Sequence, residues 1–141
     1  MQRPYNTEQL AKSLLKHNPV MLTKIAKACA VDLDKVPAIL GEVLKYLWLI
    51  GKHNQKLTPS LLVDNAWHEF ILFTRLYHSF CDKHFGRYIH HSPGGKEQEN
   101  HRNYNRTIQL YILHFGRPPE VYWGHLATDK WQDADCGSCT N

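Results

Sequence analysis

Histidine and cysteine side chains, which transition metals prefer as ligands, gather in one stretch of this sequence. Residues 63–93 hold five of the ten histidines, together with Cys81 and Asp64. The five are His68, His78, His84, His90 and His91. Imidazole and thiolate groups suit zinc and other first-row transition metals. This stretch therefore predicts a metal site, with zinc favoured over iron or copper.

The spacing of these side chains divides them between two places on a long helix. Asp64 and His68 are four residues apart, so on a helix they share a face and can hydrogen-bond or bind one ion. Cys81 and His84 are three residues apart, which also fits a shared metal. A straight helix would separate His68 from Cys81 by roughly 20 Å, because each residue adds about 1.5 Å. We therefore expect one site near Asp64 and another near the end of the helix.

A pair of adjacent histidines offers a further ligand to either place. His90 and His91 begin the sequence His-His-Ser-Pro-Gly-Gly, whose composition predicts a loop that can fold back on the helix. At most one of the two should point inward. Two ligand sets stay open: His68 with one of the pair, or Cys81 with His84 and one of the pair.

A Cys-x-x-Cys motif near the C-terminus adds two more candidate ligands, Cys136 and Cys139. One such motif is half of a tetrathiolate zinc site, and the sequence holds no second one. The two thiols could complete a mixed site by reaching the histidines, or they could have no function.

Helices are the elements expected to position these residues. No apolar alternation of period two occurs, whereas apolar residues recur at helical spacing through most of the chain. We predict an all-α array of five or six helices without a sheet, forming one domain over residues 1–133 with a flexible tail at 134–141. The expected helices are Thr7–His17, Val20–Ala30, one capped by Asp32 or Asp34 and closed by Gly51, Pro59–His84, Glu97–Phe115 and a short piece ending at Trp123.

Composition and charge argue against some classes of binding partner. The net charge of +4 arises from 17 basic and 13 acidic residues that are interspersed, and no window is dominated by Lys and Arg. Nucleic-acid binding is therefore not expected. No segment is long and apolar enough to span a bilayer, and no signal peptide is recognisable, so a cytoplasmic location is the default.

The motif Asp64-x-x-Trp67-His68-x-Phe70, followed by Tyr77-x-x-Phe80-Cys81 and Ile89-His90-His91-x-Pro93, resembles a bacterial branch of the glycine-rich domain-containing protein-like family. The resemblance covers residues 57–93, and a weaker similarity extends to Trp123-Gly124 and the terminal Cys-Gly-Ser-Cys. The plant forms commonly carry Trp-His-x-His, where this sequence has Phe70. The resemblance implies a helical domain with an Asp-Trp-His motif and no established activity.

Three hypotheses of function follow. The first is a small metal-binding protein that uses the His/Cys cluster. The second is a protein-interaction module in which histidines and aromatic residues are structural, with a protein as the partner. The third is an enzyme in which His68 acts as the acid–base group and Asp64 orients it. This third hypothesis ranks last, because no nucleophile or substrate pocket is recognisable.

Overall fold

The computed structural model describes residues 5–92 and 95–140, and describes side chains up to residue 132. Within this part the chain forms eight α-helices and no strand, so the all-α prediction is confirmed and the count of five or six helices is wrong. The helices are α1 (Thr7–His17), α2 (Pro19–Cys29), α3 (Val36–His53), α4 (Leu61–Leu72), α5 (Thr74–Phe85), α6 (Glu97–Phe115), α7 (Glu120–Trp123) and α8 (His125–Thr140). A single 3₁₀ turn, η1 (Leu33–Lys35), precedes α3.

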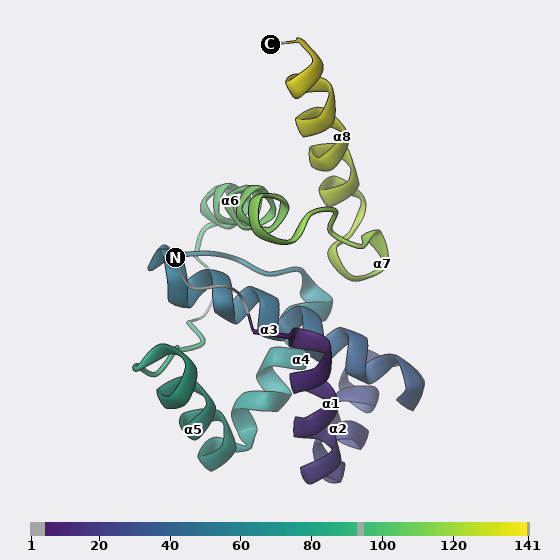
Figure 1. The fold of residues 1–141 in the computed structure, drawn as a ribbon, viewed down its shortest axis with the longest axis vertical. Helices are drawn as coiled ribbons and strands as arrows, with labels where there is room; N and C mark the ends of the chain where they lie inside the picture. The colour runs from purple at the N-terminus through teal and green to yellow at the C-terminus, as the bar shows by residue number, and fades with distance from the viewer. Residues whose placement is uncertain (1–4, 93–94, 141) are drawn as a thin grey trace.

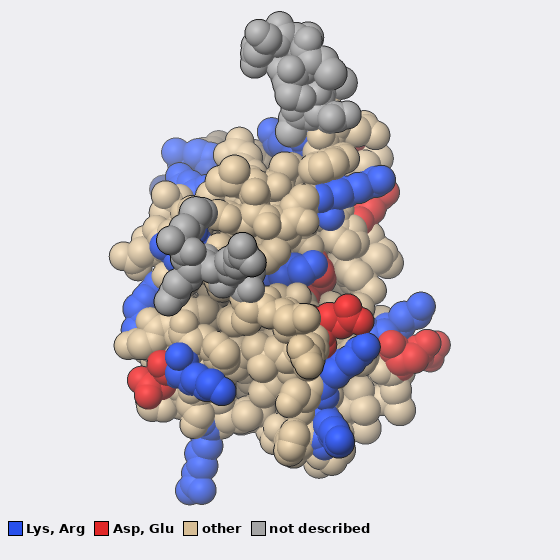
Figure 2. Space-filling model, in the orientation of Figure 1, with Lys and Arg blue, Asp and Glu red and all other residues tan. Residues whose placement is uncertain are grey.

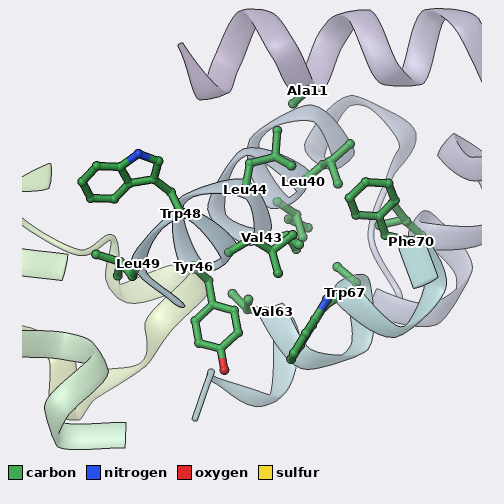
Figure 3. Packing of buried hydrophobic residues seen from close by; sticks show 14 of the residues in the cluster. Ala11, Leu40, Val43, Leu44, Tyr46, Trp48, Leu49, Val63, Trp67 and Phe70 are labelled. Atoms are coloured by element: carbon green, nitrogen blue, oxygen red, sulfur yellow. The ribbon is translucent and has the colours of Figure 1, made fainter. Parts of the chain in front are cut away.

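Helix α3 is the centre of the fold, as its sequence suggests. Apolar residues encircle it, and eleven of its 18 residues are buried. It contacts α1, α4 and α6, which pack around it (Figure 1). Figure 3 shows Leu40 and Leu44 directed toward Ala11 of α1. The rings of Tyr46 and Trp67 meet between α3 and α4, with their centroids 5.3 Å apart.

Helix α3 continues beyond the predicted C-cap at Gly51 and ends at His53. Asn54 closes it with a left-handed backbone (φ 50°), which asparagine tolerates well. Gly51 has a packing role instead, because the Phe85 ring lies against it. A Cβ atom at this position would come within 2.5 Å of that ring. The glycine therefore lets α5 approach α3 closely.

The long helix predicted over Pro59–His84 is two helices that meet at Phe73. The backbone of Phe73 leaves the helical region (φ −85°, ψ 70°), although residues 60–84 contain no proline or glycine. The turn lets α5 bury Tyr77 and Phe80 against Phe70 of α4, with ring centroids 5.1 and 5.5 Å away. Tertiary packing of aromatic side chains thus overrides the helical pattern of the sequence.

Helix α4 begins two residues later than predicted, at Leu61. Ser60 is its N-cap and accepts a hydrogen bond from the amide of Val63 at 3.2 Å. Helices α6, α7 and α8 lie at one end of the molecule and α1, α2 and α5 at the other (Figure 1). None of the described helices is both long and apolar enough to cross a membrane. The flexible tail predicted for residues 134–141 falls outside the residues whose side chains are described.

Candidate functional site

The structure brings Asp64 together with His91, and not with His68. The His91 ring, through Nε2, lies 2.7 Å from the Asp64 carboxylate and packs at a tilt against Trp67, with ring centroids 4.5 Å apart. His68 is exposed, and its nearest carboxylate is that of Glu69, at 3.9 Å. Asp64 and His68 share a helix without forming the predicted pair, because the loop after α5 places His91 over the carboxylate.

A buried tyrosine holds that loop in place. Trp67 donates from Nε1 to the Tyr77 hydroxyl at 3.0 Å, and this hydroxyl donates to the backbone carbonyl of Ile89 at 2.6 Å. Burial raises the pKa of Tyr77, so the hydroxyl keeps its proton and remains a donor. Two positions after Ile89, the chain reaches His91. His90 is exposed and packs against Tyr88.

Cys81 and His84, the two predicted ligands on α5, pack against other side chains of the fold. Cys81 is fully buried, and burial raises the pKa of its thiol, as expected of an unreactive core cysteine. His84 packs against the rings of Tyr5 and Phe80, with centroids 5.1 and 4.5 Å away. Its pKa is lowered by burial and by the adjacent charge of Lys83.

The predicted His/Cys metal cluster is therefore contradicted. Among the described side chains, residues 5–92 and 95–132, no three His, Cys, Asp or Glu residues are grouped so as to hold a metal ion. The turn at Phe73 replaces the straight helix from which the separation of the two predicted sites was derived, and Cys81 lies buried in the core. Cys136 and Cys139 lie outside the described side chains. The prediction of zinc as the ion stays untested.

A different part of the surface has the form of a binding site. A groove of about 590 Å³, which we call the α7 groove, lies where the beginnings of α4 and α6 meet α7. Its lining is mainly apolar and aromatic, and it is open to solvent along its length. The residues that line it are Thr58, Pro59, Ser60, Leu61, Leu62, Glu97, Asn100, His101, Tyr104, Glu120, Val121, Tyr122, Trp123 and Gly124.

Two aliphatic side chains stand exposed in the lining of the α7 groove. Leu61 is 76% exposed and Val121 is 77% exposed, on α4 and α7 respectively. Single exposed apolar residues are ordinary on protein surfaces. Here two of them border the same hollow, together with the rings of Tyr104 and Tyr122. These side chains give the groove an apolar surface that a ligand could cover.

Hydrogen bonds from the neighbouring helices hold the floor of the α7 groove. The last carbonyl groups of a helix lack partners within it, and α7 is only four residues long. Ser60 donates from its hydroxyl to the carbonyl of Tyr122 at 2.7 Å, and Tyr104 donates to the carbonyl of Trp123. Burial raises the pKa of Tyr104 to about 12, so its hydroxyl remains a donor. The groove is thus formed before any ligand arrives.

A buried carboxylate holds the side chain of Trp123 in position. Glu42 of α3 accepts hydrogen bonds from Trp123 Nε1 at 2.7 Å and from the Tyr111 hydroxyl at 2.5 Å. Lys45 adds an ion pair to the same carboxylate, with Nζ 3.1 Å away. The carboxylate therefore has three partners, as a buried charge requires. Burial and the adjacent Glu42 raise the pKa of Tyr111, which keeps that hydroxyl protonated.

Charge in the α7 groove is acidic, although the protein as a whole is basic. Its lining includes Glu97 and Glu120 and no lysine or arginine. A hydrogen bond from His125 lowers the pKa of Glu120, so this carboxylate is ionised at neutral pH. On the face drawn in Figure 2, Lys and Arg lie among Asp and Glu and do not merge into one patch.

Sequence reasoning missed the α7 groove. Leu61 and Val121 have the residue types of a core, and only the structure shows them exposed. Glu42 did carry a signal, because it is a single acidic residue on an otherwise apolar part of the central helix. Such a residue predicts a buried polar network.

Comparison with known proteins corrects the resemblance inferred from the Asp-Trp-His motif. Residues 9–115, three quarters of the chain, match the family described as UCP032817-like, and no glycine-rich domain family is indicated. No curated protein and no solved structure shows a significant match. The matched range contains α2 to α6 in full and ends before α7 begins. The chain belongs to the UCP032817-like family.

Proposed function

We propose that this chain is a protein-interaction module that binds a short segment of a partner protein in the α7 groove. The observation that carries the proposal is the pair of exposed aliphatic side chains, Leu61 and Val121, in one mainly apolar groove. Apolar surface in such a position gains free energy when a partner covers it, about 25 cal/mol for each Å² removed from water.

The form of the groove favours a segment of a macromolecule over a small substrate. Sites for small molecules are typically concave enough to bury 70–90% of the ligand. The α7 groove is open along its length, so a small molecule would remain largely in solvent. A peptide segment can lie along it and still gain most of its affinity from one or two apolar side chains.

Rigidity of the floor supports the same proposal. The backbone of α7 is held by Ser60 and Tyr104, and Trp123 is held by Glu42. A surface that is already ordered loses little conformational entropy when it binds.

The experiment is a selection of peptides from a randomised library on the purified chain. The affinity of the selected peptides is then measured by fluorescence anisotropy for the wild type and for Val121→Glu. We expect the substitution to weaken binding by about tenfold or more, because it places a charge where an apolar side chain of the peptide would be buried.

Leu113→Glu is the matched control. Leu113 is 71% exposed, like Val121, but it lies on α6 outside the lining of the α7 groove. This variant should bind the peptides as the wild type does. Both variants should keep the wild-type melting temperature within a few degrees, since surface substitutions change stability by about 0.5 kcal/mol or less. Failure to select any peptide would overturn the proposal, as would equal binding to Val121→Glu and the wild type.

A further inference from the structure

Resting on the proposed function, we infer that the segment bound in the α7 groove carries a lysine or arginine beside its apolar anchor residue. Two carboxylate side chains, those of Glu97 and Glu120, line the groove, and no lysine or arginine does. They lie on α6 and α7, on two separate walls of the groove. A cationic side chain in a bound segment could therefore pair with either wall.

The ends of the helices reduce this negative charge without cancelling it. Glu97 and Glu120 are in the first turns of α6 and α7, where a helix contributes about half a positive charge. Each carboxylate carries a full negative charge. The field of the helix end also falls off within its first turn. The helix ends by themselves therefore leave part of the negative charge of each carboxylate uncompensated.

The existing contacts of Glu120 leave room for a cation. Glu120 accepts a hydrogen bond from His125 at 2.9 Å through Oε1, and this contact raises the pKa of His125, so His125 and Arg117 are the cations beside the carboxylate. The side chains of His125 and Glu120 are both exposed to solvent, so a ligand can reach either of them. Lys56 and Glu99, which are near lining residues in the sequence, form an ion pair with each other at 3.2 Å. Neither Lys56 nor Glu99 lines the groove.

One exposed apolar residue and one acidic residue of the lining lie close enough in sequence to act on one short segment. Val121 follows Glu120 directly on α7. A peptide whose apolar side chain contacts Val121 thus places its neighbouring residues near Glu120. This juxtaposition gives the anchor residue and the cation adjacent or nearly adjacent positions in the partner.

The test uses the peptides selected on the wild-type chain. The inference predicts that they are enriched in Lys or Arg next to a large apolar residue. Replacing that cation by glutamine in a synthetic peptide should weaken binding to the wild type by about two- to fivefold, the range of exposed ion pairs. The same replacement should have no effect on binding to the double variant Glu97→Gln, Glu120→Gln. Raising the salt concentration should weaken the unmodified peptide more than the glutamine analogue.

Asp82→Asn is the control for the removal of charge, because Asp82 is exposed on α5 and outside the groove. It should leave the affinity of both peptides unchanged. The possible failures are distinguishable. If no peptide is selected, the proposed function is wrong. If the peptides require Val121 but lack a cation, are enriched in acidic residues or bind the double variant as tightly as the wild type, the inference alone is overturned.

Discussion

The Glu42 carboxylate links three helices through hydrogen bonds that span much of the sequence. Its partners Tyr111 and Trp123 lie 69 and 81 residues further along the chain. The type and position of Glu42 make its burial predictable, because it is the one acid in the middle of the core helix. Its partners are not predictable, since tyrosine and tryptophan occur in many places. Asp64 shows the same limit, because its partner His91 is 27 residues away.

Substitution of Glu42 by alanine should lower the free energy of unfolding by about 2–3 kcal/mol. The variant leaves the Trp123 indole and the Tyr111 hydroxyl without an acceptor in the core, and it leaves Lys45 without its counter-ion. Urea denaturation followed by circular dichroism gives the measurement.

Glu8→Ala is the matched control, because Glu8 also pairs with a lysine, Lys12, but does so in solvent. That pair should contribute at most about 1 kcal/mol. An equal loss of stability in the two variants would show that the Glu42 network does not hold α6 and α7 to α3.

At the scale of elements, helix periodicity predicts the isolated helices well. The ranges expected for α1 and α6, Thr7–His17 and Glu97–Phe115, are those observed. The turn at Phe73 could not be predicted, because nothing in the local sequence breaks the helix. It arises from the contacts of Tyr77 and Phe80 with Phe70. Local sequence patterns predict the ends of a helix correctly when residues of that helix determine those ends. They fail when packing against other helices determines where a helix ends.

The ends of α3 and α6 meet through two histidines, which predicts a dependence of stability on pH. His53 Nε2 and His114 Nε2 lie 2.8 Å apart, and Trp48 packs against His114. Burial, His53 and then Lys52 lower the pKa of His114 below the usual 6.5. The unfolded chain therefore takes up a proton at higher pH than the folded chain does, so stability is lost as pH falls from about 6.5 through the folded pKa.

His114→Gln should reduce that loss of stability. Urea midpoints at about pH 7.5 and about pH 5 measure it, and the difference between the two pH values should be smaller in the variant than in the wild type. His84 shifts in the same direction, so part of the dependence should remain. His78→Gln, at an exposed position on α5, is the control and should retain the full difference. If the difference in urea midpoint between the two pH values is the same in His114→Gln as in the wild type, the His53–His114 pair does not contribute to the pH dependence of stability.

At the scale of the whole molecule, the α7 groove is a property of tertiary structure. Its walls come from residues 58–62, 97–104 and 120–124, which are far apart in the sequence. No local pattern relates these segments, so the sequence does not predict the groove. The pattern that the sequence does contain, the histidine-rich stretch, predicts a site elsewhere. That stretch has a structural role in the fold, where Tyr77 and His91 fasten the loop after α5 to α4. The candidate site lies where α4, α6 and α7 meet.

The most direct test of the account is to map the binding surface in solution. Nuclear magnetic resonance spectra of the isotopically labelled chain would be recorded while a selected peptide is added. The account predicts that the largest chemical-shift changes occur at residues 58–62, 97–104 and 120–124, including the indole N–H of Trp123. Changes centred on Asp64 and His91, or on the hollow between Trp48 and His84, would contradict it and would place binding elsewhere on the molecule.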